Sequence, residues 1–256
     1  MKTSNEPTLR SSSNDRVLVV MAKAPRPGAV KTRLVPDLSP EAVTALYRCL
    51  LQDTLALARS LRDVDVAIMC PESDVNELAQ LAGNQGSVVA QKGGGLAAGL
   101  TSVFAHFTQD NQRACDQRRV IAFNSDSPHL PPSVLEGAFE TLATHDVVVG
   151  PTYDGGYYLV GAKGSYPTLF ANDGMGTSSA LERLLSRART LELSVGMADP
   201  FYDVDVFDDL ARLAAELRLN PARAPRTAGW LKEWELASGH SQASSRTGSR
   251  TGTGEL

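Results

Sequence analysis

Cysteine is scarce in this sequence. The three cysteines stand at positions 49, 70 and 115, far apart and without a CxxC pair. Neither they nor the four histidines show metal-ligand spacing, and no GxSxG motif offers a serine nucleophile. These absences argue against a disulfide-stapled fold, a structural zinc site and a hydrolase of the nucleophile-elbow type. Reduced cysteines are typical of a cytoplasmic protein.

Excess positive charge and long apolar runs are also missing. Lys and Arg number 25 against 29 Asp and Glu, for a formal net charge of −4, so no global basic field attracts nucleic acid or an anionic membrane. No apolar run approaches the roughly 20 residues that span a bilayer. The N-terminal "MKTSNEPTLRSSSND" lacks the apolar core of a signal peptide. We therefore expect a soluble cytoplasmic protein that binds neither nucleic acid nor membrane.

Residues 16–236 have the composition of one folded domain. The flanking segments 1–15 and 237–256 are rich in Ser, Thr and Gly and poor in apolar residues, so we predict that both are disordered tails. Between them, short apolar runs alternate with segments of helical period. This alternation predicts an α/β fold, in which helices flank a mostly parallel central sheet.

The pattern places the individual elements. Ser39 is the expected N-cap of the first helix, with Pro40 at its first position. Strands are expected at 16–21, 64–70, 87–91, 119–123, 146–151, 157–161 and 193–197. Helices are expected from 40 onward and at 74–83, 95–107, 133–144, 178–190 and 207–217. Trp230 and Trp234 lie on one face of a last helix, which we expect to dock on its own domain, with a partner as the alternative.

A cationic loop follows the first expected strand. The stretch "MAKAPRPGAVKTRL" carries Lys23, Arg26, Lys31 and Arg33, but it lacks the two glycines that a P-loop requires. Open α/β sheets bind ligands at the carboxyl ends of their strands, and lysine and arginine are the usual partners of phosphate oxygens. The loop therefore predicts a phosphate site, although a solvated basic loop explains the composition equally well.

Two acidic motifs suggest a cation site. In "FNSDSPHLPP", Asp126 follows an apolar strand, where a carboxylate can hold Mg²⁺ or Mn²⁺ against a diphosphate. An Asx turn or a helix cap is the structural alternative. In "FYDVDVFDD", Asp203 and Asp205 would point to the same side of an extended segment. Asp63 and Asp65 have the same spacing at the start of another strand, so DxD alone is a weak signal.

Two glycine-rich segments follow the same logic. In "GPTYDGGYYLVG", Gly155 and Gly156 predict a tight turn or a close backbone approach to a ligand, with a plain hairpin as the alternative. Asp154 beside them is placed to orient an acceptor hydroxyl or to act as a base. "QKGGGLAAGL" puts three glycines before a helix, where free amides can face an anion or a nucleobase, unless the segment is only a flexible linker.

Taken in order, "MAKAPRPGAVKTRL", "NSDSPHLP", "GPTYDGGYYLVG" and "DVD" resemble the bacterial transferases found beside radical-SAM and selenium-type domains. Those proteins have the GT-A, nucleotide-diphospho-sugar transferase fold. "KTRL" followed by "LSPE" is similar, more distantly, to phospholactate guanylyltransferase. The sequence departs from the transferase pattern in "QKGGGLA", where an acidic residue is frequent, and in "MGTSS", where Trp-Ser-Thr is frequent.

The resemblance implies roles for particular residues. Lys31, Asp126 and Asp154 would be the catalytic residues. The nucleotide and its phosphates would be bound by Lys23, Arg26, Lys31, Arg33, Gln91, Gly94 and Gly95. The metal would be held by Asp126, Asp203 and Asp205. The acceptor or sugar side would be lined by Asp154, Gly155, Gly156 and Thr177.

These expectations describe an enzyme. The first hypothesis is a Mg²⁺- or Mn²⁺-dependent glycosyltransferase that uses a sugar nucleotide and an unknown small-molecule acceptor. The alternative is a guanylyltransferase-like nucleotidyltransferase, which joins a nucleoside triphosphate to a phosphorylated small molecule and releases pyrophosphate. A third hypothesis is an inactive nucleotide-binding protein on the same fold.

Overall fold

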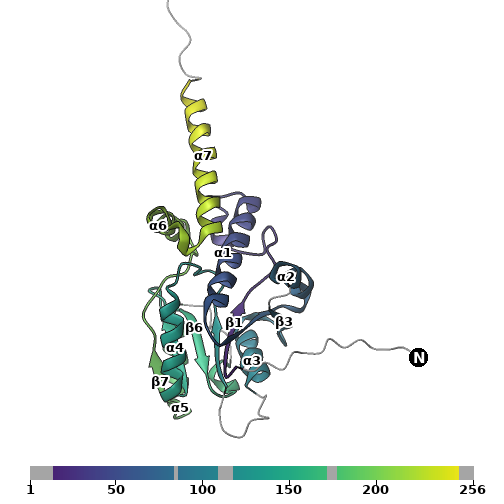
Figure 1. The fold of residues 1–256 in the computed structure, drawn as a ribbon, viewed down its shortest axis with the longest axis vertical. Helices are drawn as coiled ribbons and strands as arrows, with labels where there is room; N and C mark the ends of the chain where they lie inside the picture. Colours follow the sequence, from purple (N-terminus) through teal and green to yellow (C-terminus); the bar gives the residue numbers. More distant parts are fainter. Residues whose placement is uncertain (1–13, 84–85, 109–117, 172–177, 248–256) are drawn as a thin grey trace, which may run out of the picture.

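The fold is built on one twisted sheet. The computed structural model of the chain describes residues 14–83, 86–108, 118–171 and 178–247 (Figure 1). Within these ranges the strands are β1 (Arg16–Met21), β2 (Val64–Cys70), β3 (Ser87–Ala90), β4 (Arg119–Phe123), β5 (Val147–Pro151), β6 (Tyr157–Ala162) and β7 (Val195–Met197). They lie in the order β3-β2-β1-β4-β6-β5-β7.

The sheet is mostly parallel, as the sequence predicts. Only β6 runs against its neighbours β4 and β5, and the other pairs in the described sheet are parallel. β6 is reversed because a turn of a few residues joins it to β5, and so short a connection can only form a hairpin. The α/β architecture is confirmed.

The expected helices all form. They are α1 (Pro40–Ser60), α2 (Val75–Ala82), α3 (Gly95–Phe107), α4 (Pro132–Thr144), α5 (Ala180–Thr190), α6 (Phe207–Leu219) and α7 (Pro225–Thr247). The Ser39 side chain accepts a hydrogen bond from the amide of Ala42, as expected of an N-cap, and Gly83 ends α2. A short 3₁₀ helix inside the cationic loop, Thr32–Leu34, was not expected.

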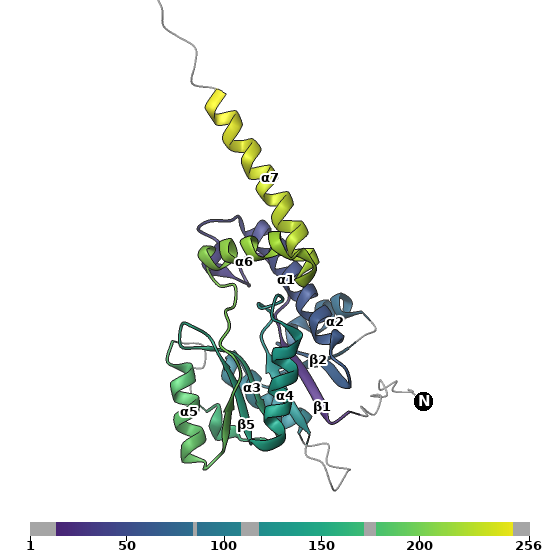
Figure 2. The same ribbon diagram turned by 60° about the vertical axis from the view of Figure 1, so that its left-hand side comes forward.

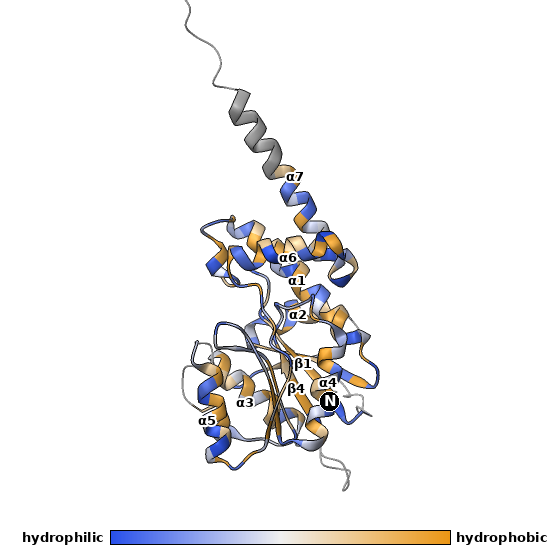
Figure 3. Cartoon of the chain, turned by 90° about the vertical axis from the view of Figure 1, so that its left-hand side faces the viewer, coloured by the Kyte–Doolittle hydropathy of each residue, from blue (hydrophilic) through white to orange (hydrophobic). Residues whose placement is uncertain are grey.

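Helices cover both faces of the sheet. Leu18 and Val20 of β1 face a buried cluster shared with α1, α2 and α4, whereas Val17 and Val19 face the cluster shared with α3 and α5. This alternation follows from the two-residue period of a strand. The central strands are accordingly apolar on both faces, and Figure 3 shows β1 and β4 largely in the colour of hydrophobic residues.

A third apolar cluster lies beyond the sheet. It joins α1, α6 and α7 to Leu34 of the cationic loop, which is fully buried. Trp230 and Trp234 stack with ring centroids 6.0 Å apart and pack against this cluster. The predicted docking of this helix on its own domain is therefore confirmed. The cluster anchors the cationic loop from the side opposite the sheet.

The last helix is longer than the sequence suggests. The backbone of α7 is helical to Thr247, so part of the segment predicted to be a disordered tail from residue 237 onward is helical. Its far end extends away from the rest of the domain (Figures 1 and 2). Helical hydrogen bonds are local, so a helix can continue without a surface to pack on. Residues 1–13 and 248–256 of the predicted tails lie outside the described residues.

In the part of the chain that is described, no helix combines the length and the apolar character needed to cross a membrane.

His129 is a buried titratable group in the loop after β4. Its side chain is fully buried, with its ring centroid 4.5 Å from that of Tyr202 and 4.9 Å from that of Phe201. Neither ring nitrogen has a hydrogen-bond partner among the described residues. Burial, reinforced by the nearby charges of Arg223 and Arg212, lowers the pKa of His129 to about 3.

This histidine should make the fold acid-sensitive. Between pH 6.5 and 3, His129 is protonated in the unfolded chain but neutral in the native state. The free energy of unfolding therefore falls as the pH is lowered through this range. The loss from one such group is at most about 1.4 kcal/mol per pH unit. We expect His129→Phe, which keeps a ring in contact with Tyr202, to reduce the loss of stability between pH 7 and 5. Urea unfolding at the two pH values measures this, and identical losses in the variant and the wild type would contradict it.

Candidate active site

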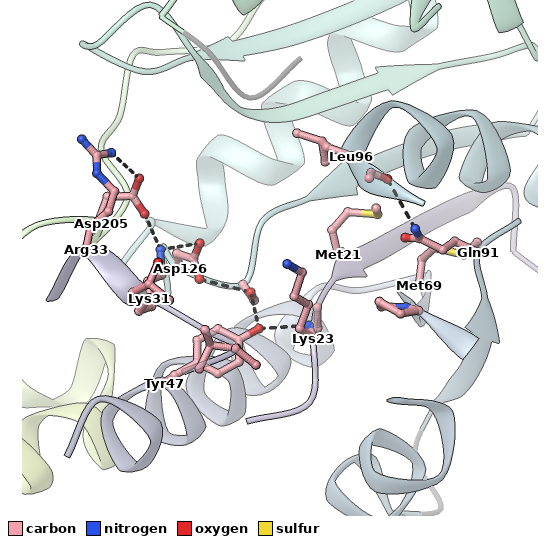
Figure 4. A pocket seen from close by; sticks show the side chains of 17 residues that line it. Met21, Lys23, Lys31, Arg33, Tyr47, Met69, Gln91, Leu96, Asp126 and Asp205 are labelled. Carbon is pink, nitrogen blue, oxygen red and sulfur yellow. Dashed lines mark hydrogen bonds and ion pairs between the residues drawn. The ribbon is translucent and has the colours of Figure 1, made fainter. Parts of the chain in front are cut away.

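An ion-pair cluster lies where the carboxyl ends of β1 and β4 meet the segment before α6. The ammonium nitrogen of Lys31 is 2.7 Å from Asp126 Oδ2 and 2.7 Å from Asp205 Oδ1, and a guanidinium nitrogen of Arg33 is 3.1 Å from Asp205 Oδ2. Figure 4 shows Lys31 pointing between the two carboxylates. Only 6% of the Lys31 side chain is exposed, against 65% for Arg33. Lys31 is thus the buried centre of the cluster.

The backbone directs Lys31 inward. Its φ is 46° and its ψ 42°, a left-handed conformation that residues other than glycine seldom adopt. Val30 and Leu34 on either side are buried, and they fix the loop against the domain. Such strain persists only where surrounding packing enforces it, and it is concentrated at functional sites.

Three carboxylates gather at the same point. Oxygens of Asp126, Asp203 and Asp205 all lie within 4.8 Å of one another. Within the described ranges no other group of His, Cys, Asp or Glu meets this criterion, and Asp63 and Asp65 do not belong to one. A set of carboxylate oxygens suits Mg²⁺ or Mn²⁺ better than a softer metal. The three side chains therefore fit a divalent cation.

Backbone contacts hold the two acidic segments together. The amide of Val204 donates to the carbonyl of Asp126 at 3.2 Å, and the Ser127 hydroxyl donates to the carbonyl of Tyr202 at 3.1 Å. The Asp209 carboxylate accepts the amides of Asp205 and Val206 at the start of α6. The carboxylates are thus fixed by the fold before any ligand arrives.

The charged groups of the cluster shift one another's pKa values. Burial, together with the carboxylates of Asp126 and Asp205, raises the pKa of Asp203 to about 6 even though Lys31 opposes the change. Burial alone would lower the pKa of Lys31, but the two carboxylates outweigh it and hold that pKa above its usual value. For Asp205, burial is outweighed by Lys31 and Arg33, which keep its pKa low. Carboxylates crowded in this way favour a cation among them.

A first cavity of about 450 Å³ opens on the cationic side of the cluster. Lys23, Lys31 and Arg33 line it together with Asp126 and Asp205. Its far end is formed by the side chains or backbone of Met21, Met69, Pro71, Gln91, Gly95 and Leu96. One end of the cavity is therefore cationic and the other has apolar walls. The cationic end matches the phosphates of a nucleotide, and the apolar end matches its base.

Gln91 and Gly95 occupy the predicted nucleotide side. The Gln91 amide nitrogen donates to the carbonyls of Gly93 and Gly95 at 2.9 and 3.3 Å, which fixes the glycine segment at the start of α3. Gly94 is the N-cap of α3 but does not line the cavity. The segment is an ordered turn rather than the flexible linker that its composition also allowed.

Tyr47 is a site residue that the sequence did not reveal. Tyr47 lies on α1. Its hydroxyl accepts a hydrogen bond from the amide of Lys23 at 3.2 Å and lies 3.0 Å from the hydroxyl of Ser125. Ser125 in turn donates to Asp126 at 3.1 Å. Burial is the main cause that raises the pKa of Tyr47 to about 12, so the hydroxyl stays protonated. Its place four residues after the buried Val43 was the available signal.

A second cavity, of about 680 Å³, lies on the other side of the carboxylates. It shares Arg33, Asp126 and Asp205 with the first cavity. Asp154, Gly156 and Asp203 line it further, as do apolar side chains of α3, β4 and β6. The two cavities thus meet at the carboxylate cluster.

The β5–β6 turn carries Asp154 into the second cavity. One Asp154 carboxylate oxygen accepts hydrogen bonds from the Thr152 hydroxyl and from the amide of Gly156. Gly155 has φ 88°, and a Cβ atom there would lie 2.0 Å from the carbonyl oxygen of Ser178. Gly155 is therefore required by the turn and its contact with the start of α5, and it does not line the second cavity. Thr177, predicted on the acceptor side, lies outside the described residues.

Arg26 is placed away from both cavities. Its guanidinium pairs with Asp74 at 2.8 Å and with Glu77 at 3.0 Å, and it also donates to the carbonyl of Ser73. Asp74 accepts the amide of Ala24 as well. Arg26 thus ties the cationic loop to α2, and this position does not support its predicted role at the phosphates.

This placement gives a test of the loop. We expect Arg26→Gln to leave nucleotide affinity unchanged, whereas Arg33→Gln weakens it, because only Arg33 reaches the cavity. Isothermal titration of a nucleoside diphosphate against both variants compares them directly. Equal losses of affinity in the two variants would mean that the whole loop acts as a diffuse positive charge.

Comparison with known proteins supports the fold. A family model described as "Uncharacterized protein conserved in bacteria (DUF2064)" matches residues 54–177. The crystal structure of a "putative nucleotide-diphospho-sugar transferase" from Desulfovibrio desulfuricans is 28% identical over 87% of this chain and 96% of its own, with a TM-score of 0.78. No curated protein matches the chain.

Two more distant structures have the same fold. A 4-diphosphocytidyl-2C-methyl-D-erythritol synthase from Anaerococcus prevotii is 10% identical over 80% of this chain and 97% of its own, with a TM-score of 0.53. A nucleotidyl transferase from Methanothermobacter is 15% identical over 80% of this chain and 99% of its own, with a TM-score of 0.54. At these identities the likeness concerns the fold alone.

Proposed function

We propose that this protein is a transferase that uses a nucleotide-activated donor, and that it transfers a sugar from a sugar nucleotide. The observation that carries the proposal is the position of Lys31 and the three carboxylates between two cavities of different character. The likeness to the Desulfovibrio protein supports a nucleotide-using transferase. Kinship with transferases found beside radical-SAM domains stays a prediction.

In this proposal the first cavity holds the donor. Lys31 and Arg33 bind the phosphates, while Met21, Met69 and Leu96 enclose the base. A divalent cation held by Asp126, Asp203 and Asp205 would offset negative charge on the departing diphosphate. The fixed positions of Lys31 and Arg33 add to that stabilisation because they need no rearrangement as the charge develops.

The second cavity holds the acceptor. The acceptor oxygen forms a bond to the anomeric carbon, and the bond between that carbon and the diphosphate oxygen breaks, with the electron pair leaving on the diphosphate. Asp154 takes the acceptor proton, since its carboxylate lies in this cavity with one oxygen used by the turn.

A nucleotidyltransferase is the second candidate. The three cations of the first cavity suit a triphosphate as well as a diphosphate. The two activities leave different products, because sugar transfer releases a nucleoside diphosphate and nucleotidyl transfer releases pyrophosphate.

The test is to incubate the protein with Mg²⁺ or Mn²⁺, a panel of sugar nucleotides or nucleoside triphosphates, and an extract of small molecules. Products are identified by mass spectrometry. We expect nucleoside diphosphate and a glycosylated product. Pyrophosphate release without sugar transfer would replace the proposed activity by the second candidate.

A further inference from the structure

We infer that Tyr47 is a positioning residue, which fixes the cationic loop and the carboxylate of Asp126 relative to each other. The inference rests on the proposed function, because it gives the donor phosphates to that loop and the cation to that carboxylate. Tyr47 lies on α1, outside the two motifs that contain these groups.

A chain of hydrogen bonds runs from the loop to the carboxylate through Tyr47. The Ser125 hydroxyl donates its single proton to Asp126 Oδ1, because a carboxylate can only accept. The bond of 3.0 Å between the hydroxyls of Tyr47 and Ser125 must then take its proton from Tyr47. The Tyr47 oxygen in turn accepts the amide of Lys23 at 3.2 Å. Every bond of the chain therefore points from the loop toward Asp126 (Figure 4).

Both ends of this chain belong to the first cavity. Lys23 lines its cationic end, and Asp126 lies where the two cavities meet. Asp126 Oδ1 is held by Ser125 and Oδ2 by Lys31 at 2.7 Å, so each oxygen of this carboxylate has its own anchor. Tyr47 is 4% exposed, and burial above all raises the pKa of its hydroxyl to about 12, so the chain keeps its proton at neutral pH. Loss of this hydroxyl therefore loosens the loop at one end and Ser125 at the other.

The backbone around Asp126 is held by other bonds. The carbonyl of Ser125 accepts the hydroxyl of Thr54 at 3.2 Å, and the carbonyl of Asp126 accepts the amide of Val204 at 3.2 Å. These contacts do not involve the Tyr47 hydroxyl. Tyr47→Phe and Ser125→Ala therefore break the chain at successive links while the backbone around it stays in place.

Mn²⁺ affinity reports the carboxylate end of the chain. Electron paramagnetic resonance of free Mn²⁺ is recorded on the full chain as the wild type, Tyr47→Phe, Ser125→Ala and the double variant. Groups that only support a metal ligand are worth about 10- to 100-fold in metal affinity, so we expect each single variant to bind Mn²⁺ about tenfold more weakly. The two residues act in series, so the double variant should bind no more weakly than the weaker of the two single variants.

Inorganic pyrophosphate reports the loop end and needs neither a metal nor a base. Its affinity is measured by isothermal titration in EDTA. Tyr47→Phe leaves the Lys23 amide without this acceptor, so we expect it to bind pyrophosphate about threefold more weakly, the scale of one neutral hydrogen bond. Ser125→Ala should have the smaller effect, because the Ser125 hydroxyl lies beyond Tyr47 on the carboxylate side of the chain.

Tyr166→Phe is the matched control, since Tyr166 is partly buried and lines neither cavity. It should change neither affinity, and the melting temperature of each variant shows whether it is folded. A Tyr47→Phe variant with a lower melting temperature but unchanged Mn²⁺ affinity would overturn the inference and leave the proposed function standing. Losses of Mn²⁺ affinity that add up in the double variant would also overturn it. A wild type that binds neither Mn²⁺ nor pyrophosphate would overturn the proposed function, and the inference with it.

Discussion

Asp126→Asn is expected to weaken Mn²⁺ binding roughly 100-fold or more, because changes to groups that only support metal ligands already cost about 10- to 100-fold. The substitution keeps the size of the side chain but removes one of the three carboxylate charges that gather within 4.8 Å. Lys31 contacts the carboxylates of Asp126 and Asp205, so in this variant Asp205 is the one of the two that remains a carboxylate. Donor turnover should fall with metal affinity.

Electron paramagnetic resonance of free Mn²⁺ measures this affinity without any knowledge of the substrate. Asp63→Asn is the matched control, since Asp63 has the same DxD spacing but lies outside the cluster. The melting temperature of each variant shows whether it has remained folded. If a folded Asp126→Asn variant binds Mn²⁺ as tightly as the wild type does, the carboxylates do not form the metal site.

Asp53→Ala is expected to lower the free energy of unfolding by about 3 kcal/mol, the scale of losing a buried charged partner. Asp53 lies on α1 and is 2% exposed. Its carboxylate accepts the amide and hydroxyl of Thr227 at 2.8 and 2.9 Å, and more distant bonds from the backbone and side chain of Arg226. It therefore caps the start of α7 from another helix, and the variant leaves the buried amide and hydroxyl of Thr227 without this acceptor.

Urea unfolding measures the loss, and Asp53→Asn serves as the graded comparison. Asparagine keeps one acceptor oxygen near Thr227, so its effect should lie between those of the wild type and the alanine variant. The nucleotide affinity of Asp53→Asn should match that of the wild type, because Asp53 does not line either cavity. A loss in the alanine variant no larger than that of an exposed substitution would show that α7 docks through its apolar face alone.

Much of the fold follows from local patterns in the sequence. Apolar runs of period two and helical segments with clear caps, such as Ser39 before Pro40, predict the strands and helices because these signals depend only on neighbouring residues. The short "TYDGG" connection allowed a hairpin as one of two alternatives, and the structure has that hairpin between β5 and β6. The pairing of β6 with β4 depends on contacts between segments distant in the sequence.

The candidate site was harder to predict than the fold. Asp126 could be proposed because it follows a strand at the expected ligand-binding end of the sheet, whereas its partnership with Asp205 was implied by the family resemblance. Composition could not separate Lys31, which turns inward between those two carboxylates, from Arg26, which turns outward to Asp74. That choice is made by contacts with residues distant in the sequence. Tyr47 was not predicted as a site residue for the same reason, since the partners of its hydroxyl belong to two other segments.

In the proposed function, the cations of the loop and the carboxylates form one site for a nucleoside diphosphate. Isothermal titration of UDP, GDP, ADP, CDP and TDP, each with Mg²⁺ and with EDTA, tests it in the wild type, in Lys31→Met and in Lys163→Met. Lys163 follows β6 at the opposite end of the sheet and serves as the matched lysine control. We expect Mg²⁺ to tighten the binding of at least one nucleotide. We also expect Lys31→Met to weaken this binding about tenfold or more, the equivalent of one charged hydrogen bond, while Lys163→Met leaves it unchanged. Nucleotide binding that is indifferent to both Mg²⁺ and the loss of Lys31 would contradict it.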